Sequence, residues 1–409
     1  MTFLEKQQQY AELLVKLGLH VQKGQELVIR CAAEAVGFAR LVAKAAYEAG
    51  AREVITQFRD EVLTKLRYEN SPLEVFETIP EWEGESMNYY AARGAAFLSI
   101  VSEDPEAMKG VDSAKMMARN KASHAAFKGY YDRMDKSELQ WCVAAVPSAG
   151  WAKKVFPDKC EEDAVAALWD AIFTAVRVGK DAEAKWREHS RSLRERSKLL
   201  NRKQFKELHY TNSLGTDFSV GLVDNHIWAG GSEDTASGVT FIANMPTEEI
   251  FTMPHCEKAE GVLKSALPLS HMGSMIKNFT LLFHEGKVID FSAEEGEETL
   301  RMILETDEGS RRLGEVALIP YDSPISNTGV LFLNTLFDEN ASCHFALGRC
   351  YPNTMEGGEL LPNDELRAKG GNDSMNHVDF MIGTADLTIT GIDENGNETL
   401  LFKNGNWAI

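Results

Sequence analysis

The stretch from Glu26 to Phe58, ELVIRCAAEAVGFARLVAKAAYEAGAREVITQF, decides the fold of the first half of the chain. A short apolar run at 26–31 is followed by an alanine-rich segment at 33–48 and, after Gly50, by a second apolar run at 52–58. Continuous apolar runs of this length are typical of strands buried on both faces, whereas the segment between them favours a helix. The stretch therefore predicts two parallel strands joined by a helix.

The same alternation extends on both sides of this stretch. We expect helices at 3–17 and 59–69, apolar strands at 95–101 and 141–147, and a helical segment between those strands that ends near 128. This order predicts an N-terminal open parallel α/β sheet with helices on both faces. No strand is followed by GxGxxG or GxxxxGK[ST], which argues against a dinucleotide or nucleotide ligand.

The second half of the chain has a different pattern. Residues 160–203 predict a long, highly charged helix that links two domains, an N-terminal domain at 1–200 and a C-terminal domain at 201–409. Short, turn-rich strands follow at 205–211, 217–223, 240–245, 280–285 and 287–292, with a helix at 296–305 and a final hairpin that turns at 393–396. The C-terminal domain is therefore expected to be α+β and mostly antiparallel.

The composition limits the partners and the compartment. The 409 residues are 44% apolar and carry a formal net charge of −19, which argues against nucleic acid and suits metal ions and amine-bearing substrates. The N-terminus does not resemble a signal peptide, and no run of about 18 apolar residues occurs, so no membrane partner is expected. The six cysteines are scattered without a CxxC pair, which favours free thiols in a reducing cytoplasm.

The candidate chemistry starts from SMNHVDFMIG at 374–383, which predicts a strand. His377 and Asp379 are two residues apart, so both side chains project from the same face of that strand. An imidazole beside a carboxylate suits a divalent metal of borderline softness, such as zinc, cobalt or manganese. The alternative is a surface pair or a buried histidine with a hydrogen-bond partner.

Three further segments place polar residues against apolar runs. Glu248 and Glu249 follow a predicted strand, Glu315 enters the strand LGEVAL directly after a glycine, and His344 interrupts the run CHFALG, which leads to Tyr351. A buried carboxylate is costly unless it is paired or bound to metal. The alternatives are an exposed acidic turn for the glutamate pair, a salt bridge for Glu315, and ordinary packing for His344 and Tyr351.

The ligand-type residues of these segments form a consistent set of three carboxylates and two imidazoles: Glu249, Glu315, His344, His377 and Asp379. Such a set suits two adjacent divalent ions that share one bridging carboxylate. Zinc, cobalt, manganese and magnesium all accept this mixture of oxygen and nitrogen donors, so the sequence leaves the metal open.

The four segments resemble the signature regions of the thermophilic-metallopeptidase family of aminopeptidases, the aminopeptidase T, S and II type. The matching runs are NMPTEEIFT, LGEVAL, CHFALGRCY and HVDFMIG, in the same order and at similar spacing, and the resemblance covers essentially the whole chain. It implies a homodimeric metalloaminopeptidase that releases N-terminal amino acids from peptides by means of a water activated by two metal ions. It implies Tyr351 as a catalytic or substrate-stabilising residue and, as metal ligands, Glu249, Glu315, His344, His377 and Asp379. The C-terminal domain is then the metal-binding and catalytic domain, in which we also expect Glu249 to be catalytic, as a carrier of the proton.

Several points stay open at this level. Another amidase or hydrolase with two metals, or a non-catalytic peptide-binding relative, would fit the same ligands. Glu248 competes with Glu249 as the carboxylate that moves a proton to the leaving amine. The loop at 352–362 reads as a surface loop or as a lid, and His226 and His255 read as exposed or packed side chains rather than ligands.

Overall fold

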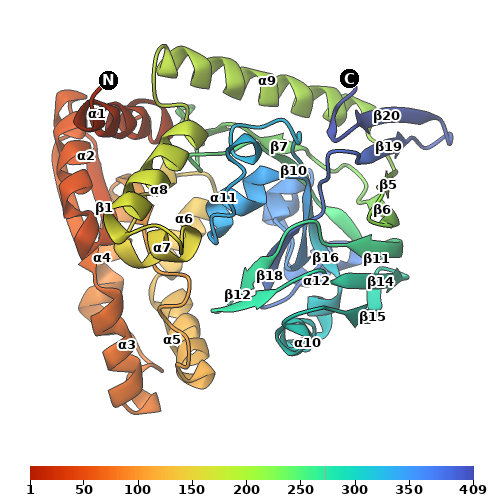
Figure 1. Cartoon of the computed structure of the whole chain (residues 1–409), viewed down its shortest axis with the longest axis horizontal. Coiled ribbons are helices and arrows are strands. Elements are labelled where there is room, and N and C mark those ends of the chain that lie inside the picture. Colours follow the sequence, from red (N-terminus) through yellow and green to blue (C-terminus); the bar gives the residue numbers. More distant parts are fainter. Residues whose placement is uncertain (272) are drawn as a thin grey trace. The chain divides into compact units, whose positions relative to one another are not determined.

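The computed structural model describes residues 1–271 and 273–409. The contacts within the chain divide it into two compact units, 1–187 with 232–246 and 188–231 with 247–409. Figure 1 colours the chain from red at the N-terminus to blue at the C-terminus. The chain crosses between the units three times, and the single boundary after residue 200 stays a prediction.

The first unit contains a parallel sheet of four strands in the order β2-β1-β3-β4. Its strands are β1 (Glu26–Ala32), β2 (Glu53–Arg59), β3 (Ala96–Val101) and β4 (Trp141–Ala145). Its helices are α1 (Phe3–Leu13), α2 (Val36–Glu48), α3 (Glu61–Asn70), α4 (Glu81–Ala92), α5 (Ser113–Ala126), α6 (Lys128–Asp135), α7 (Ala149–Val155) and α8 (Glu161–Ala175). The predicted N-terminal parallel α/β sheet is confirmed.

The prediction of one continuous helix over 160–203 is wrong. The chain forms α8 and then α9 (Ala182–Lys203), separated by residues 176–181. Gly179 has φ 142° and Asp181 has φ 58°, conformations outside the right-handed helical region. The indole Nε1 of Trp186 donates a hydrogen bond of 2.8 Å to the carbonyl of Val176, which fixes the path of the chain through this break.

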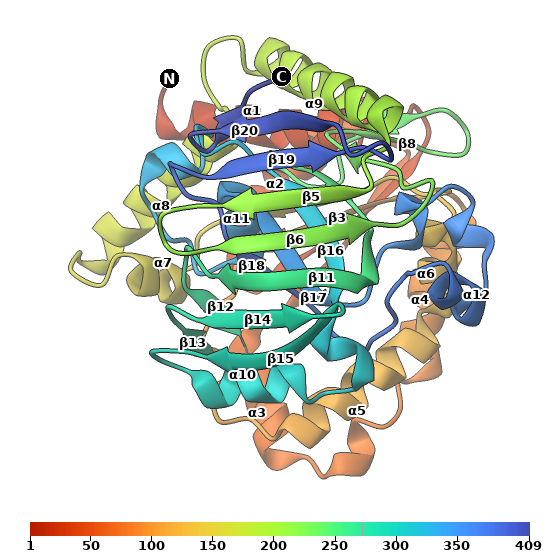
Figure 2. The same ribbon diagram turned by 90° about the vertical axis from the view of Figure 1, so that its right-hand side faces the viewer.

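The second unit contains an antiparallel sheet of eight strands in the order β15-β14-β11-β6-β5-β19-β20-β21 (Figure 2). The strands are β5 (Glu207–Thr211), β6 (Asp217–Leu222), β11 (Pro254–Lys264), β14 (Thr280–His284), β15 (Lys287–Ser292), β19 (Thr388–Ile392), β20 (Glu398–Lys403) and β21 (Asn406–Trp407). The predicted antiparallel character of the C-terminal half is confirmed.

A second antiparallel sheet in this unit has the order β18-β17-β16-β10-β7. Its strands are β18 (His377–Met381), β17 (His344–Gly348), β16 (Leu313–Leu318), β10 (Ile250–Thr252) and β7 (Ala229–Gly230). The unit also contains α10 (Glu297–Leu304), α11 (Thr335–Asp338), α12 (Asn363–Ala368) and the ribbon of β12 (Leu269–His271) with β13 (Ser274–Ile276). A short ribbon of β8 (Glu233–Asp234) with β9 (Thr240–Phe241) belongs to the first unit.

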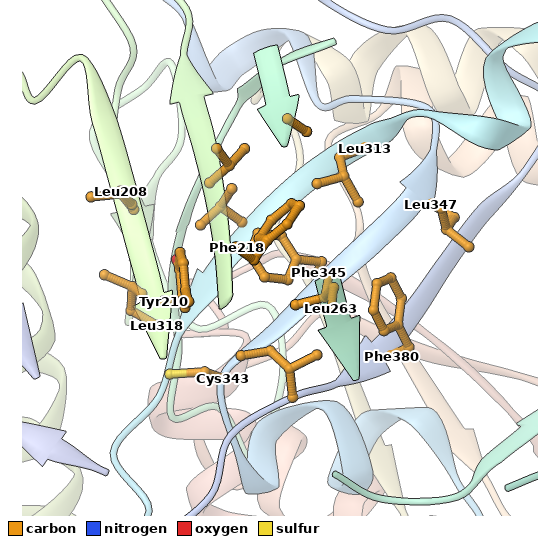
Figure 3. Close-up of a cluster of buried hydrophobic side chains, with 14 of the residues drawn as sticks. Leu208, Tyr210, Phe218, Leu263, Leu313, Leu318, Cys343, Phe345, Leu347 and Phe380 are labelled. Atoms are coloured by element: carbon orange, nitrogen blue, oxygen red, sulfur yellow. The ribbon is translucent and has the colours of Figure 1, made fainter. Parts of the chain in front are cut away.

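The two sheets of the second unit share one apolar core (Figure 3). The ring of Phe345 on β17 lies 5.1 Å from that of Tyr210 and 5.4 Å from that of Phe218, measured between ring centroids. Phe380 on β18 packs against Phe279 in the same way, at 5.6 Å. Because side chains alternate along a strand, the opposite face of β17 and β18 is left for polar residues.

No helix in the described part of the chain is both long and apolar enough to cross a membrane.

Candidate metal centre

The alternation of β17 and β18 brings three of the predicted site residues to one face. Phe345, Val378 and Phe380 are buried in the core, so His344, His377 and Asp379 project from the other side of the same strands. The two strands pair with His344 opposite Met381, Ala346 opposite Asp379 and Gly348 opposite His377. The strand register therefore sets the spacing of both imidazoles and the carboxylate.

Glu315 reaches this face through a bulge in β16. The pairing with β17 shifts between Leu313 and Glu315, so Leu313 faces the core and Glu315 faces the donors although they are separated by a single residue, Gly314. A Cβ at Gly314 would collide with the carbonyl oxygens of Arg349 and Gly348. Glycine is therefore required where the bulge turns Glu315 toward the cluster.

Glu249 lies directly before β10, whose Ile250 is anchored in the core. One of its carboxylate oxygens is 3.3 Å from Nε2 of His344. The neighbouring Glu248 instead has a carboxylate oxygen 3.4 Å from Nε2 of His189, and its backbone N–H donates to Asn340. The structure thus brings Glu249 rather than Glu248 to the other predicted ligands.

Glu315 connects two groups of donors. Its oxygens lie 3.3 Å from Nε2 of His344 and 3.5 Å from Nε2 of His377, which is also 3.2 Å from a carboxylate oxygen of Asp379. The ligand atoms of Glu249, Glu315 and His344 lie within 4.8 Å of one another, and so do those of Glu315, His377 and Asp379. All five predicted ligand residues therefore converge.

The backbone orients both imidazoles. Nδ1 of His344 lies 2.8 Å from the carbonyl of Glu339, and Nδ1 of His377 lies 2.7 Å from the carbonyl of Arg349. Since a carbonyl only accepts, each Nδ1 must carry the proton, and each Nε2 lone pair faces the carboxylates. This is the arrangement of histidines that bind metal through Nε2.

The charges in the cluster perturb its protonation. Burial would lower the pKa of His344, but its bond to Glu315 and the nearby carboxylates outweigh this effect and raise that pKa to about 9. Burial would also lower the pKa of His377, but the charge of Asp379 and its hydrogen bond to this histidine outweigh burial and raise the pKa of His377 to about 9. Burial raises the pKa of Glu249 to about 8, against the effect of His344. Protons and metal ions therefore compete for the same atoms.

The chemistry of this donor set fits divalent metal ions. Among the described residues, no lysine or arginine pairs with the carboxylates of Glu249, Glu315 or Asp379, whose only partners of opposite charge are the two imidazoles. Buried carboxylates need compensating charge. Oxygen donors mixed with imidazole nitrogens supply the ligands of zinc, cobalt, manganese and magnesium sites.

Sequence reasoning missed a further carboxylate beside this cluster. Glu339 follows α11, and its pKa lies well above the usual range because burial and the charges of Asp379, Glu249 and Glu315 all raise it. It lies in a turn at 339–341, not in an apolar run. The only signal in the sequence is its place in the acidic pair Asp338-Glu339, five residues before His344.

Tyr351 and the remaining candidates lie around or away from the cluster. The ring of Tyr351 is 4.7 Å from that of His377 and 6.0 Å from that of Phe251, and the residue is 44% exposed. His226 is buried elsewhere and donates from Nδ1 to the carbonyl of Val223, at 3.0 Å. In the loop at 352–362, short turns at 352–354 and 358–360 flank Met355, which forms a bridge with His226.

The fold and the donor set together define a metalloprotein with a centre suited to hydrolysis. The chain belongs to the thermophilic metalloprotease (M29) family, whose sequence pattern matches residues 3–407. It is 46% identical over 408 residues to aminopeptidase AmpS of Bacillus subtilis (strain 168), a match that covers 100% of this chain and 99% of that protein. It is 45% identical over 400 residues to aminopeptidase 2 of Geobacillus stearothermophilus, with 98% and 97% covered.

A solved structure, wild-type AmpT from Thermus thermophilus, superimposes with a TM-score of 0.93 at 39% identity and covers 100% of both chains. The family resemblance seen in the sequence is thus confirmed. The chain is a metal-dependent peptide hydrolase, and these relatives support an aminopeptidase function.

Proposed function

We propose that the protein removes N-terminal amino acids from peptides with two divalent metal ions held by Glu249, Glu315, His344, His377 and Asp379. The observation that carries this proposal is the position of Glu315, which belongs to both donor groups. One group adds Glu249 and His344, and the other adds His377 and Asp379. A carboxylate common to two such groups is suited to bridge two ions.

When bound, the ions supply a water of lowered pKa and polarise the peptide carbonyl. Tyr351 lies against His377 at the edge of the cluster, which supports a role in which its hydroxyl donates a hydrogen bond to the oxyanion that develops on that carbonyl. The excess of carboxylates favours a substrate that brings an amine, which is what a free N-terminus provides.

The leaving amine takes up a proton, which a nearby carboxylate can deliver. Glu249 and Glu339 are the candidates in the cluster, since both interact electrostatically with Glu315 and Asp379. Glu248 is the weaker candidate because its carboxylate lies beside His189. Glu339→Gln tests the shuttle role, because Glu339 is not one of the five proposed ligands. If Glu339 is the shuttle, this variant keeps its metal content and loses turnover of amino acid amides, whereas full turnover leaves the role to Glu249.

The physiological metal, the assembly and the compartment are part of the same proposal. Zinc, cobalt, manganese and magnesium suit the donors. The family resemblance supports a homodimer, and the scattered cysteines without a CxxC pair support a cytoplasmic location. The face of α3 that carries Leu63 and Leu66, one turn apart, supports an interface, since these side chains are 66% and 48% exposed. Light scattering of the purified protein tests the dimer, and a monomer over the working concentration range would reject it.

The decisive experiment compares unblocked and N-acetylated peptides. The enzyme is treated with a chelator, then assayed after zinc, cobalt, manganese or magnesium is restored singly. We expect activity to disappear with the chelator, to return with at least one metal, and to be confined to unblocked substrates. Hydrolysis of N-acetylated peptides at a comparable rate would instead indicate another amidase. Full metal content and activity in Glu315→Ala would exclude the shared ligand.

A further inference from the structure

A cavity lies within the first unit, where the parallel strands end. It has a volume of about 210 Å³ and is lined by residues that follow the carboxyl ends of β1, β2 and β3. The sheet order β2-β1-β3-β4 reverses direction between β1 and β3, because the chain passes from β1 to β2 on one side and then to β3 on the other. Open α/β sheets bind ligands at such a switch point.

A buried hydroxyl in this cavity has no partner. Ser102 follows β3, lines the cavity and is only 2% exposed, yet its Oγ makes no hydrogen bond among the described residues. A buried polar atom without a partner is costly and rare in folded proteins. The hydroxyl is therefore available to a group that enters the cavity.

The cavity has one positive and several negative side chains. Arg59, the last residue of β2, lines it, and its side chain forms no salt bridge or hydrogen bond among the described residues, although the charges of Glu83 and Glu103 act on it from a greater distance. Glu34, Glu61 and Glu103 also line it, and none of them pairs with a basic side chain in the described part of the chain. Burial raises the pKa of Glu61, and the charges of Glu34 and Glu103 add to this effect, so the three carboxylates lie close enough to repel one another.

This arrangement disfavours two common classes of ligand. A divalent ion needs convergent donors, and within the described residues the sets of three histidine, cysteine or carboxylate ligands that come close enough lie only in the metal centre of the second unit. A phosphate would face Asp60 and Glu61 at the start of α3, where two carboxylates repel an anion. A ligand that carries one negative and one positive group can pair with Arg59 and with the carboxylates of the cavity.

We propose that this cavity binds a free α-amino acid in its zwitterionic form. Its carboxylate accepts hydrogen bonds from Arg59 and Ser102, its ammonium lies among Glu34, Glu61 and Glu103, and its side chain contacts Val62 and Met108. The volume is below the roughly 300–1,000 Å³ of pockets for drug-sized ligands, which fits one small molecule. None of its lining residues belongs to the metal centre, and the proposal does not depend on the proposed peptidase mechanism.

The test is equilibrium dialysis of metal-loaded protein against radiolabelled L-leucine. It is carried out in the Glu315→Ala background as well as in the wild type, because that variant removes the metal centre as a second place for the amine. We expect saturable binding in both, and a loss of about tenfold or more in affinity when Arg59→Ala or Ser102→Ala is added. Arg40→Ala, an exposed arginine of α2 outside the cavity, is the matched control and keeps full affinity.

Blocked ligands test the two charges. N-acetyl-L-leucine lacks the ammonium and 3-methylbutylamine lacks the carboxylate, so both should bind about tenfold or more weakly than leucine. L-leucine should also raise the melting temperature of the wild type but not that of Ser102→Ala, whose ligand-free stability stays at or above that of the wild type because an unpaired hydroxyl has been removed. Equal binding of all three ligands, or unchanged leucine binding in Arg59→Ala, would overturn the proposal.

Discussion

Replacing Gly314 with alanine perturbs the metal centre without changing any donor side chain. The new Cβ would meet the backbone carbonyl oxygens of Gly348 and Arg349, below the 3.0 Å that real Cβ contacts respect. Neither oxygen belongs to a flexible side chain, so β16 must move away from the end of β17. The carbonyl of Arg349 also accepts the hydrogen bond from Nδ1 of His377. One methyl group therefore displaces Glu315 and releases His377 at the same time.

The size of the effect follows from these two contacts. Overpacking against backbone typically costs about 1–3 kcal/mol of stability. Loss of a hydrogen bond that orients a ligand typically weakens metal binding by about 10–100-fold. A displacement of about 1 Å in a catalytic group can reduce the rate about 100-fold. We therefore expect Gly314→Ala to fold, to bind metal more weakly, and to be far less active at limiting metal.

The assay combines urea unfolding, metal titration and hydrolysis of an unblocked amino acid amide. Gly37→Ala is the matched control, because Gly37 lies in α2 with no atom within 4 Å of an added Cβ. That change should leave metal affinity and activity intact and raise stability by about 0.5–1 kcal/mol. If Gly314→Ala binds metal and turns over substrate as the wild type does, the bulge does not position Glu315, and the reasoning fails.

Three other predictions concern Tyr351, the pair Glu248 and Glu249, and Asp307. Tyr351→Phe should retain its metal content and lose about 100–1,000-fold in kcat if the hydroxyl donates to the oxyanion, whereas wild-type turnover would reject that role. Glu248→Gln should keep metal affinity within about threefold of the wild type, since its buried carboxylate lies beside His189 and not at the proposed ligands, while Glu249→Gln loses it as measured by metal titration. Burial would raise the pKa of Asp307, but hydrogen bonds from Met375, Ser374 and Ser310 outweigh it and lower that pKa. Its contribution to stability is therefore present above the unfolded pKa of about 4 and is lost as the pH falls through the folded value, so the stability gap between the wild type and Asp307→Asn should stay constant from about pH 7 to about pH 5 and narrow as the pH falls below the unfolded pKa in urea unfolding.

Much of the fold could be predicted because apolar patterning is local. The run at 26–31 and its partner at 52–58 are continuous enough to indicate buried parallel strands, and they form β1 and β2. The strand β11 was missed because residues 257–261 mix charged side chains with glycine, and only pairing with β6 and β14 makes them a strand. The helix break at 176–181 depends on the backbone conformations of Gly179 and Asp181, which the helical pattern of residues 160–203 does not indicate.

The candidate ligands were visible because each interrupts or borders an apolar strand. Their convergence was not, since it depends on strand order and on the register shift beside Glu315. Glu339 lies in a turn with no such contrast and becomes apparent only through its neighbours in space. The family resemblance already favoured Glu249 over Glu248, and the position of His189 supplies the physical reason.

The two carbonyls that orient the imidazoles affect which substitutions the site can tolerate. Both acceptors belong to the main chain, at Glu339 and Arg349, so a change of side chain at position 349 keeps the acceptor in place. Arg349 is exposed, and its identity can vary without loosening His377. The backbone therefore sets the orientation of the nitrogens that face the metal site. Most single substitutions nearby should leave this orientation unchanged, and Gly314, which shapes the backbone there, is the exception.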